Sequence, residues 1–449
     1  MLETVLQDPL IDQIKAIEAG QADDFWSFKN TARRTGAHAL IHYPAMMVPT
    51  LQGKLLDAIR LARPETDSVL DPFAGSGTIL VESMNRQLNF TGIDINPLAT
   101  LACLAKSGPY YVDAFDAKRA ELMSRIGADK GRTLFVKFEG QDKWFNTDVS
   151  LELSRIARCI IEESSLWARR LFWLAFAKVV RSSCNSRMST YKLHVHKADS
   201  IPTRSSPEIS FAVVLENFSN HLRSQNEVWT KAGSMREGIY TKTTEIKLGD
   251  SRKLLDDENF RGSFDVVMTS PPYGDNATTI PYGQYAYLPL KWIVPGDVSE
   301  YLDPALLANT HAIDTASLGG SRKRAAERGA DLVGKYDAAK RYAEGLCTTS
   351  SEYKRFVVFF ADLEDCLDKI CVVTKVRGYQ AWTIGNRHLG GKRVPMEDIL
   401  AEMMAARGVE TIGRIRRSIH AKKMALRNSI SATMSTETVL LSRKSAQLT

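Results

Sequence analysis

Several features that would mark unusual classes of protein are missing from this sequence. No apolar run reaches the roughly 18 residues of a membrane span, so we expect no membrane helix. The segment that starts at Met1 has no basic-then-apolar pattern, which argues against a secretory signal. The 6 cysteines are scattered without a Cys-x-x-Cys pair, so we expect neither a zinc finger nor a disulfide scaffold, but reduced thiols in the cytoplasm.

Strong charge of one sign is also missing. The chain has 449 residues, of which 44% are hydrophobic and 25% charged, as in ordinary globular proteins. Lys and Arg number 59 against 52 Asp and Glu, a net charge of +7. This excess permits a polyanionic partner without requiring one. Whether such a partner is expected therefore depends on where the basic residues lie along the chain.

An alternation of strands and helices predicts an α/β fold. Residues 68–71 form a short β run that is followed by a glycine turn, and residues 78–86 then have helical spacing. Residues 90–94 predict a second strand, and Asn96-Pro97 opens the next helix. This order indicates a doubly wound, mostly parallel sheet with right-handed crossovers. Further core strands are expected at 245–248, 264–268, 378–384 and 438–441.

The glycine turn, Asp71 to Thr78, reads Asp-Pro-Phe-Ala-Gly-Ser-Gly-Thr and predicts a ligand site. Its glycines let a ligand approach the backbone at the start of a helix. An acid before the glycines suits an ammonium group, such as that of the methionine part of S-adenosylmethionine, and Asp94 at the next strand end suits ribose hydroxyls. The plain alternative is a tight turn with a helix-capping acid.

The Pro-Pro corner, Ser270 to Tyr273, follows a strongly apolar strand. Its two prolines cannot donate backbone hydrogen bonds, so their carbonyls are rigidly held acceptors. Such acceptors suit an exocyclic amine, and Tyr273 adds a planar face for stacking on a base. The alternative is a structural turn with a buried tyrosine.

Together, these motifs resemble those of the amino-methylating DNA methyltransferases. The segments that resemble the family's motifs are residues 71–78, 92–97 and 269–274, with additional similarity at 42–45, 249–251 and 419–434. Serine at the first position of the Pro-Pro corner looks most like the cytosine-N4 branch. One departure is that a long insertion separates the Asp94 and Asp250 segments. The resemblance implies a Rossmann-like methyltransferase sheet, S-adenosylmethionine as cofactor and double-stranded DNA as substrate. It also admits a cognate restriction or defence nuclease as partner.

The resemblance assigns roles to individual residues. The catalytic residues that it implies are Ser270, Pro271, Pro272 and Tyr273. The cofactor-binding residues that it implies are Pro44, Asp71, Phe73, Gly75, Gly77, Thr78, Asp94, Asn96, Asp250 and Ser251. The expected organisation is an N-terminal helical segment (1–60), core (61–108), a basic insertion that is a candidate for target recognition (109–245), core with the Pro-Pro corner (246–300), a lid-like excursion without strong periodicity (301–350), and the remaining core with a basic stretch (351–449).

Two basic stretches are candidates for contact with DNA. The expected DNA-binding residues are Arg187 and Lys192 in the insertion, and Arg416, Arg417, Lys422 and Lys423 near the C-terminus. A solvated surface is the alternative for both stretches. His194 and His196 lack an apparent third ligand, so no metal is expected.

The mechanism that we expect is direct attack by the N4 amine of a flipped cytosine on the sulfonium methyl group. No covalent enzyme intermediate is needed, and no Pro-Cys pair, the nucleophile of cytosine-C5 methylation, occurs. Three other functions stay open: DNA adenine-N6 methylation, RNA guanine-N2 methylation, and a catalytically inactive DNA-binding subunit.

Overall fold

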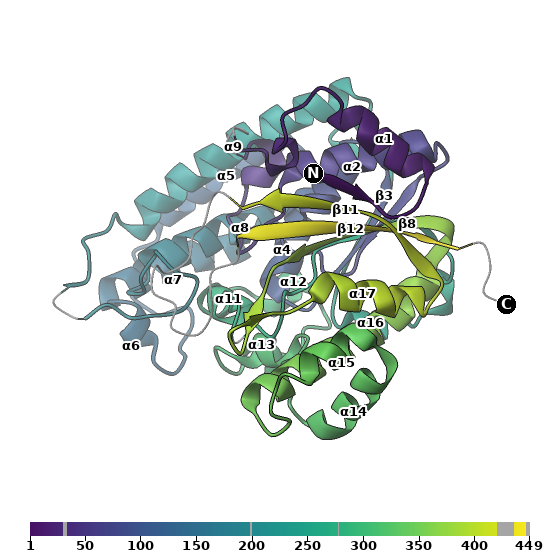
Figure 1. The fold of residues 1–449 in the computed structure, drawn as a ribbon. Coiled ribbons are helices and arrows are strands. Elements are labelled where there is room, and N and C mark those ends of the chain that lie inside the picture. The colour runs from purple at the N-terminus through teal and green to yellow at the C-terminus, as the bar shows by residue number, and fades with distance from the viewer. Residues whose placement is uncertain (30–33, 198–199, 277, 420–434, 446–449) are drawn as a thin grey trace.

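A sheet of eight strands lies at the centre of the protein, in the order β1-β11-β12-β8-β7-β2-β3-β6 (Figure 1). The computed structural model describes residues 1–449 except 30–33, 198–199, 277, 420–434 and 446–449. The parallel strands are β6 (Thr244–Leu248), β3 (Asn89–Asp94), β2 (Ser68–Asp71), β7 (Phe264–Thr269) and β8 (Thr374–Gly385). The antiparallel strands are β12 (Thr436–Lys444), β11 (Val409–Ser418) and β1 (Leu2–Thr4). The expected α/β class with a doubly wound, mostly parallel sheet is confirmed.

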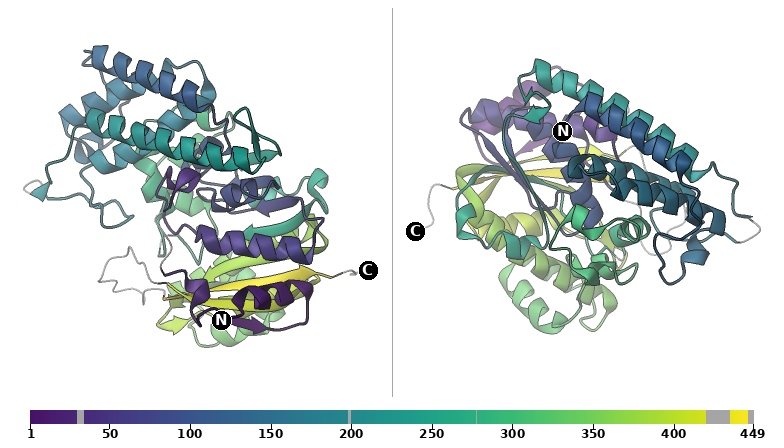
Figure 2. Two further views of the ribbon diagram at one scale, coloured as in Figure 1. Left: turned by 90° about the horizontal axis from the view of Figure 1, so that it is seen from above. Right: turned by 180° about the vertical axis from the view of Figure 1, so that it is seen from behind.

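Helices cover both faces of this sheet and make three layers (Figure 2). Successive strand residues point to opposite faces, so Val69 packs in one buried cluster and Leu70 in the other. The first face is covered by α1 (Pro9–Glu18), α2 (Pro49–Ala62), α3 (Thr78–Met84) and α4 (Pro97–Ser107). The second face is covered by α10 (Ser251–Leu254), α16 (Ser351–Val373) and α17 (Met396–Ala405). Because both faces are covered, the central strands β2 and β7 are buried on both sides.

The strand order reverses between β2 and β7. From β2 the chain passes to β3 on one side, whereas β7 and β8 lie on the other side. The carboxyl ends of parallel strands diverge at such a switch point and leave a crevice in which α/β proteins bind ligands. Asp71 ends β2 and Thr269 ends β7, so the fold itself brings the glycine turn and the Pro-Pro corner together.

The insertion after α4 is helical, as expected. Its elements are α5 (Val112–Ala128), α6 (Gln141–Trp144), α7 (Thr147–Ile161), α8 (Leu166–Ser183), α9 (Pro207–Lys231), β4 (Met235–Arg236) and β5 (Ile239–Tyr240). Helix α8 is buried along most of its length and packs against α4 and α9. Arg169, in the basic part of this insertion, forms an ion pair with Asp297 at 2.8 Å. Some of the positive charge therefore stabilises the fold.

Residues 301–348 differ from the irregular excursion that we expected. They include α13 (Ala312–Ala316), α14 (Ala325–Lys335) and α15 (Asp337–Ala343), which follow α11 (Tyr282–Leu290) and α12 (Pro295–Val298). Leu332 is fully buried, and α14 packs against α16. Only Ala325, Gly329 and Leu332 are buried on α14, so few large apolar side chains marked this helix in the sequence.

The basic stretch near the C-terminus also differs in part from expectation. Residues 409–418 are strand β11, which pairs with β1 and β12, and the short strands β9 (His388–Leu389) and β10 (Lys392–Arg393) form a separate hairpin. Lys422 and Lys423 lie outside the described residues. Within the described ranges, no helix combines the length and apolarity needed to cross a bilayer.

Candidate active site

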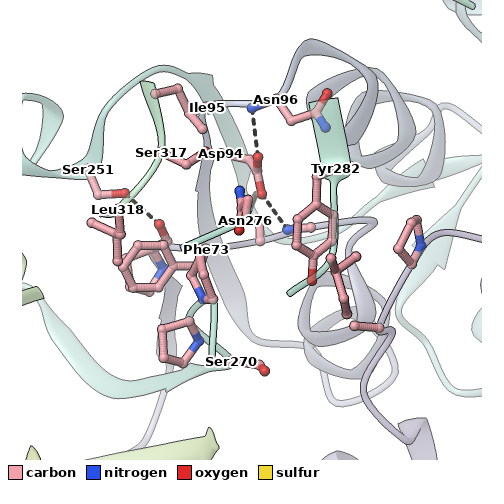
Figure 3. A pocket seen from close by; sticks show the side chains of 18 of the residues that line it. Phe73, Asp94, Ile95, Asn96, Ser251, Ser270, Asn276, Tyr282, Ser317 and Leu318 are labelled. Atoms are coloured by element: carbon pink, nitrogen blue, oxygen red, sulfur yellow. Dashed lines mark hydrogen bonds between the residues drawn. The ribbon is translucent and has the colours of Figure 1, made fainter. Parts of the chain in front are cut away.

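The sequence-predicted motifs meet in one pocket at the carboxyl ends of β2, β3, β6 and β7 (Figure 3). The predicted residues that line it are Pro44, Phe73, Gly75, Thr78, Asp94, Asn96, Asp250, Ser251, Ser270, Pro271, Pro272 and Tyr273. Asp71 is fully buried and Gly77 caps α3. These two residues shape the glycine turn rather than form the wall of the pocket.

The glycine turn is held by hydrogen bonds to its two flanking acids. Gly75 and Gly77 have φ values of +51° and +78°, which only glycine adopts without strain. The Gly75 amide donates to Asp94 Oδ2 at 2.8 Å. Asp71 accepts from Thr269 Oγ1 at 2.6 Å and from the Phe73 amide at 3.1 Å. Asp71 therefore ties the end of β2 to the end of β7.

Burial changes the ionisation of both acids. It raises the pKa of Asp71 to about 7, although the hydrogen bonds from Thr269 and Phe73 oppose the shift. It also raises the pKa of Asp94 to about 6, against hydrogen bonds from the Asn96 and Gly75 amides. Perturbed carboxyl groups in a cleft are typical of functional sites.

The next wall of the pocket is built around Asn96. Its side chain caps α4 by accepting from the Leu98 amide at 3.0 Å, and its Nδ2 donates to Tyr43 Oη at 2.8 Å. The Tyr43 ring stacks on Tyr282, with 5.6 Å between the ring centres. This contact fixes the 42–45 segment against α11.

The Asp250 segment completes the wall beside Phe73. Asp250 caps α10 by accepting from the Arg252 amide at 2.9 Å, and Arg252 in turn lies 3.2 Å from Asp362. The Ser251 hydroxyl donates to the Pro72 carbonyl (Figure 3). Asp250 and Ser251 thus hold the glycine turn in place as well as line the pocket.

The Pro-Pro corner leaves the end of β7 toward the same pocket. Ser270 Oγ lies 3.2 Å from Tyr273 Oη, and Tyr273 Oη donates to Glu437 Oε1 at 3.2 Å. Burial and then the Glu437 carboxylate raise the pKa of Tyr273 well above its ordinary value. The tyrosine is therefore neutral, with its ring at the pocket and its hydroxyl directed at β12.

Arg187 and Lys192 lie on a hairpin beside this pocket, which we call the 185–196 hairpin. Arg187 and His194 pair through the backbone at 2.9 Å, and the Leu193 amide donates to Gln284 Oε1 at 3.0 Å. Arg187 is exposed and Lys192 is half-buried. The hairpin thus presents cations next to the pocket.

The expected DNA contacts on β11 have other surroundings. Arg416 is half-exposed and pairs with Glu3 at 2.6 Å. The Arg417 side chain is only 6% exposed and pairs with Glu437 at 3.0 Å. A buried, paired guanidinium cannot neutralise a DNA phosphate, so the structure gives Arg417 a different neighbour, the carboxylate behind Tyr273.

Comparison with known proteins agrees with this geometry. A family model described as DNA methylase, for N6 and N4 methyltransferases, matches residues 15–101. The type II methyltransferase M.MvaI of Kocuria varians is 27% identical over 453 residues, covering 96% of each chain. These similarities support assignment of the chain to the amino-methylating DNA methyltransferases.

Other similarities are weaker. The type II methyltransferase M.MjaII of Methanocaldococcus jannaschii is 29% identical over 132 residues, covering 27% of this chain and 24% of that protein. The structure of the rRNA methyltransferase aviRa from Streptomyces viridochromogenes covers 94% of this chain and 93% of its own, at 10% identity and a TM-score of 0.33. So low a score supports no conclusion about function.

S-adenosylmethionine is the methyl donor of this methyltransferase, and the pocket suits it. Asn276 Oδ1 is buried at the pocket and has no partner among the described residues, so it can accept from an ammonium or hydroxyl group. Phe73 and Leu318 offer apolar surface for a planar ring on the wall opposite Tyr282 (Figure 3). Among the described residues, no group of three or more His, Cys, Asp or Glu is placed to hold a metal ion.

Sequence reasoning missed three contributors to this methyltransferase site. Leu318 comes from the segment that we expected to be irregular, and so does Asp314, which follows the pocket-lining Ile313 and accepts from the Gly283 amide at 2.9 Å. Burial raises the pKa of Asp314 to about 6. Glu437 lies on the last strand, far from any motif, and no local pattern indicated it. Its position is set by the pairing of β12 with β8.

Proposed function

We propose that this protein is a site-specific methyltransferase that acts on the N4 amine of cytosine in double-stranded DNA. The observation that supports it most is the location of the Pro-Pro corner, with serine first, in the same pocket as the glycine turn. The family similarity to type II DNA methyltransferases supports DNA as the substrate.

In this proposal, the chain's own residues bind and orient the base. The target amine is inaccessible inside a duplex, so the nucleotide is rotated out at a cost of a few kcal/mol. Stacking on the Tyr273 ring offsets about 1–3 kcal/mol of that cost. When bound, S-adenosylmethionine supplies an electrophilic methyl group on a sulfonium.

Ser270 Oγ and the Pro271 carbonyl then accept hydrogen bonds from the amine. The nitrogen lone pair of a base amine is delocalised into the ring, and these acceptors favour a tetrahedral nitrogen with a localised lone pair. Holding the amine in that geometry before reaction reduces the barrier, because the orientation is already established on binding. The corner supplies only acceptors and a ring face, so a covalent bond between enzyme and base is not required.

The 185–196 hairpin is the surface that we assign to phosphate contact. Arg187 is exposed and Lys192 lies on the same hairpin, which is bonded to α11 through Leu193 and Gln284, so both cations can approach the backbone of a duplex whose base enters the pocket. The half-exposed Arg416 is a further candidate, while its pairing with Glu3 reduces its availability.

We predict that Tyr273→Ala and Ser270→Ala slow methylation far more than they weaken cofactor binding. Loss of stacking in Tyr273→Ala removes about 1–3 kcal/mol, roughly a fivefold to 150-fold loss in rate. Ser270→Ala is milder, about 0.5–1.5 kcal/mol, because the Pro271 carbonyl still accepts one amine hydrogen. Single-turnover methylation with saturating S-adenosylmethionine measures both rates.

Two variants control for this experiment. Tyr301→Ala removes a tyrosine that is 89% exposed, and Ser107→Ala removes a hydroxyl that donates to Leu104 at the end of α4. Both should keep the wild-type rate. If Tyr273→Ala and Ser270→Ala also keep it, the Pro-Pro corner is only a structural turn and the proposed function is wrong.

A further inference from the structure

A chain of hydrogen bonds runs from the base side of the pocket to the last strand of the sheet. It begins at Ser270 Oγ, passes at 3.2 Å to Tyr273 Oη and continues at 3.2 Å to Glu437 Oε1. The other oxygen of Glu437 accepts from Arg417 Nε at 3.0 Å. The Glu437 side chain is 18% exposed and that of Arg417 is 6% exposed, so this far end of the chain is largely shielded from water.

The carboxylate at the far end fixes the direction of every hydrogen bond in this chain. A carboxylate can only accept hydrogen bonds, and Glu437 forms an ion pair with the guanidinium of Arg417 at 3.0 Å. Tyr273 has one hydroxyl hydrogen, which it therefore donates to Glu437. Its oxygen is left to accept, so Ser270 donates its own single hydrogen to Tyr273.

The consequence concerns the lone pairs of Ser270. A serine hydroxyl can ordinarily rotate and act as donor or acceptor. Here the hydrogen is already committed to Tyr273, so Ser270 presents only acceptor lone pairs to a ligand in the pocket. The adjacent Pro271 carbonyl is also an acceptor. A base with an amine can donate to both groups. A base with a carbonyl at the same place would bring a third acceptor oxygen against these two and leave all three without a hydrogen-bond donor.

We propose that Glu437, held by Arg417, is a positioning residue that makes Ser270 an obligate acceptor and so makes the pocket select an amine over a carbonyl. This inference rests on the proposed function, because it assumes that a base enters beside the Pro-Pro corner. It adds two residues that do not themselves line the pocket: Glu437, which contacts Tyr273, and Arg417, which contacts Glu437. Arg417, which the sequence placed among DNA contacts, has in this proposal a role in base selection.

Glu437→Gln tests this proposal sharply because Arg417 dictates how the new amide is oriented. The guanidinium only donates, so it attracts the amide oxygen and leaves the amide NH₂ facing Tyr273. Tyr273 then accepts from the glutamine and donates to Ser270, and Ser270 donates into the pocket. The direction of the whole chain is reversed by a change that preserves shape.

The measurement is the relative affinity for duplexes that differ only in the target base. The methylated position is first mapped with the wild-type protein, and duplexes then carry cytosine or uracil there. Both bases are placed opposite an abasic site, so that neither is paired and the cost of flipping is matched. Binding is measured with S-adenosylhomocysteine in place of the methyl donor, which makes the readout independent of activity.

We expect the wild-type protein to bind the cytosine duplex about tenfold or more tightly than the uracil duplex. Glu437→Gln should abolish or invert this preference, and Tyr273→Phe should reduce it, because the ring remains but Ser270 becomes free to rotate. Glu437→Asp, which keeps a carboxylate, should retain the preference for cytosine. Glu410→Gln removes an exposed carboxylate of the same sheet and should leave the ratio unchanged.

A wild-type ratio in both Glu437→Gln and Tyr273→Phe would overturn the inference. Circular dichroism melting identifies any variant that fails to fold. If Glu437→Gln does not fold, the ratio of the affinities of Tyr273→Phe for the cytosine and uracil duplexes tests the inference alone. Failure of the proposed function is seen separately, in the mapped product of the wild-type protein. If that product is N6-methyladenine, the cytosine assignment is wrong, and adenine and hypoxanthine duplexes test the same inference.

Discussion

At the scale of single residues, the pocket depends on acids whose charge is costly to bury. Asp94 accepts from the Gly75 and Asn96 amides, each at 2.8 Å, and so shapes the glycine turn before any ligand arrives. Burial still raises its pKa to about 6, which means that the ionised form is under-solvated. A ligand that donates hydrogen bonds to this carboxylate stabilises the ionised form.

We predict that the affinity for S-adenosylmethionine decreases as the pH falls from 7 to 5. The ligand favours ionised Asp94, so binding lowers the pKa of this group and releases a proton near pH 6. Affinity is therefore highest above this pKa and is lost as the pH falls through it. Titration calorimetry in buffers of different ionisation enthalpy measures both the affinity and the released proton.

Asp94→Asn is the matched control for this pH dependence. It should weaken binding by about 1.5–3 kcal/mol at pH 7, since a charged hydrogen bond is lost, without changing DNA affinity. Asp71 and Asp314 also titrate nearby, with pKa values of about 7 and about 6, so the decisive quantity is the difference between the wild-type and Asp94→Asn curves. Identical curves would remove Asp94 from the cofactor site.

At the scale of elements, the strands and the turns at their ends were predictable, because their signals are local. An apolar run followed by glycines or prolines indicated β2 and β7, and Asn96-Pro97 correctly marked the start of α4. Contacts between distant elements were not predictable. Glu437 lies 164 residues after Tyr273, and only the pairing of β12 with β8 brings them together.

The two misjudged segments have the same physical explanation. Charge on β11 suggested an exposed stretch, but the side chains of Arg414 and Arg417 are largely buried and pair with acids from α17 and β12. Charge also hid α14, whose buried side chains are few. In both segments tertiary partners, which a single sequence does not reveal, decide whether a charged residue faces solvent.

We predict that Leu332→Ala destabilises the protein by about 2–5 kcal/mol, the usual cost of emptying a buried leucine site. Leu332 is fully buried on α14 in the cluster that includes α16. Denaturant unfolding measures the loss, and Leu61→Ala, at a side chain that is 64% exposed, is the control. A loss below about 1 kcal/mol would show that α14 is a loosely attached lid instead of part of the core.

The 185–196 hairpin gives a prediction about DNA binding. Arg187→Ala and Lys192→Ala should each weaken binding similarly for all sequences and lower the slope of log K against log salt by about one unit. Lys15→Ala on α1, which is exposed, should leave the slope unchanged. Fluorescence anisotropy over a range of salt concentrations measures these slopes, and wild-type slopes in both hairpin variants would mean that the hairpin is only a solvated surface.

At the scale of the whole molecule, one sheet serves two purposes. Its parallel half ends in the glycine turn and the Pro-Pro corner, at the switch point between β2 and β7. Its antiparallel half, β12 and β11, supplies Glu437 and Arg417 behind Tyr273. The helical insertion packs on α4 and presents the 185–196 hairpin beside the pocket. In our account, the core therefore holds the cofactor and the base, while the insertion contacts the duplex.

The central claim is most directly tested by identifying the methylated nucleoside. Duplex DNA is incubated with the protein and S-adenosylmethionine labelled in the methyl group, then digested to nucleosides and analysed by chromatography and mass spectrometry. The account predicts labelled N4-methyldeoxycytidine, which forms more slowly with Tyr273→Ala than with the wild-type protein. Labelled N6-methyldeoxyadenosine, or label in RNA and not in DNA, would contradict it.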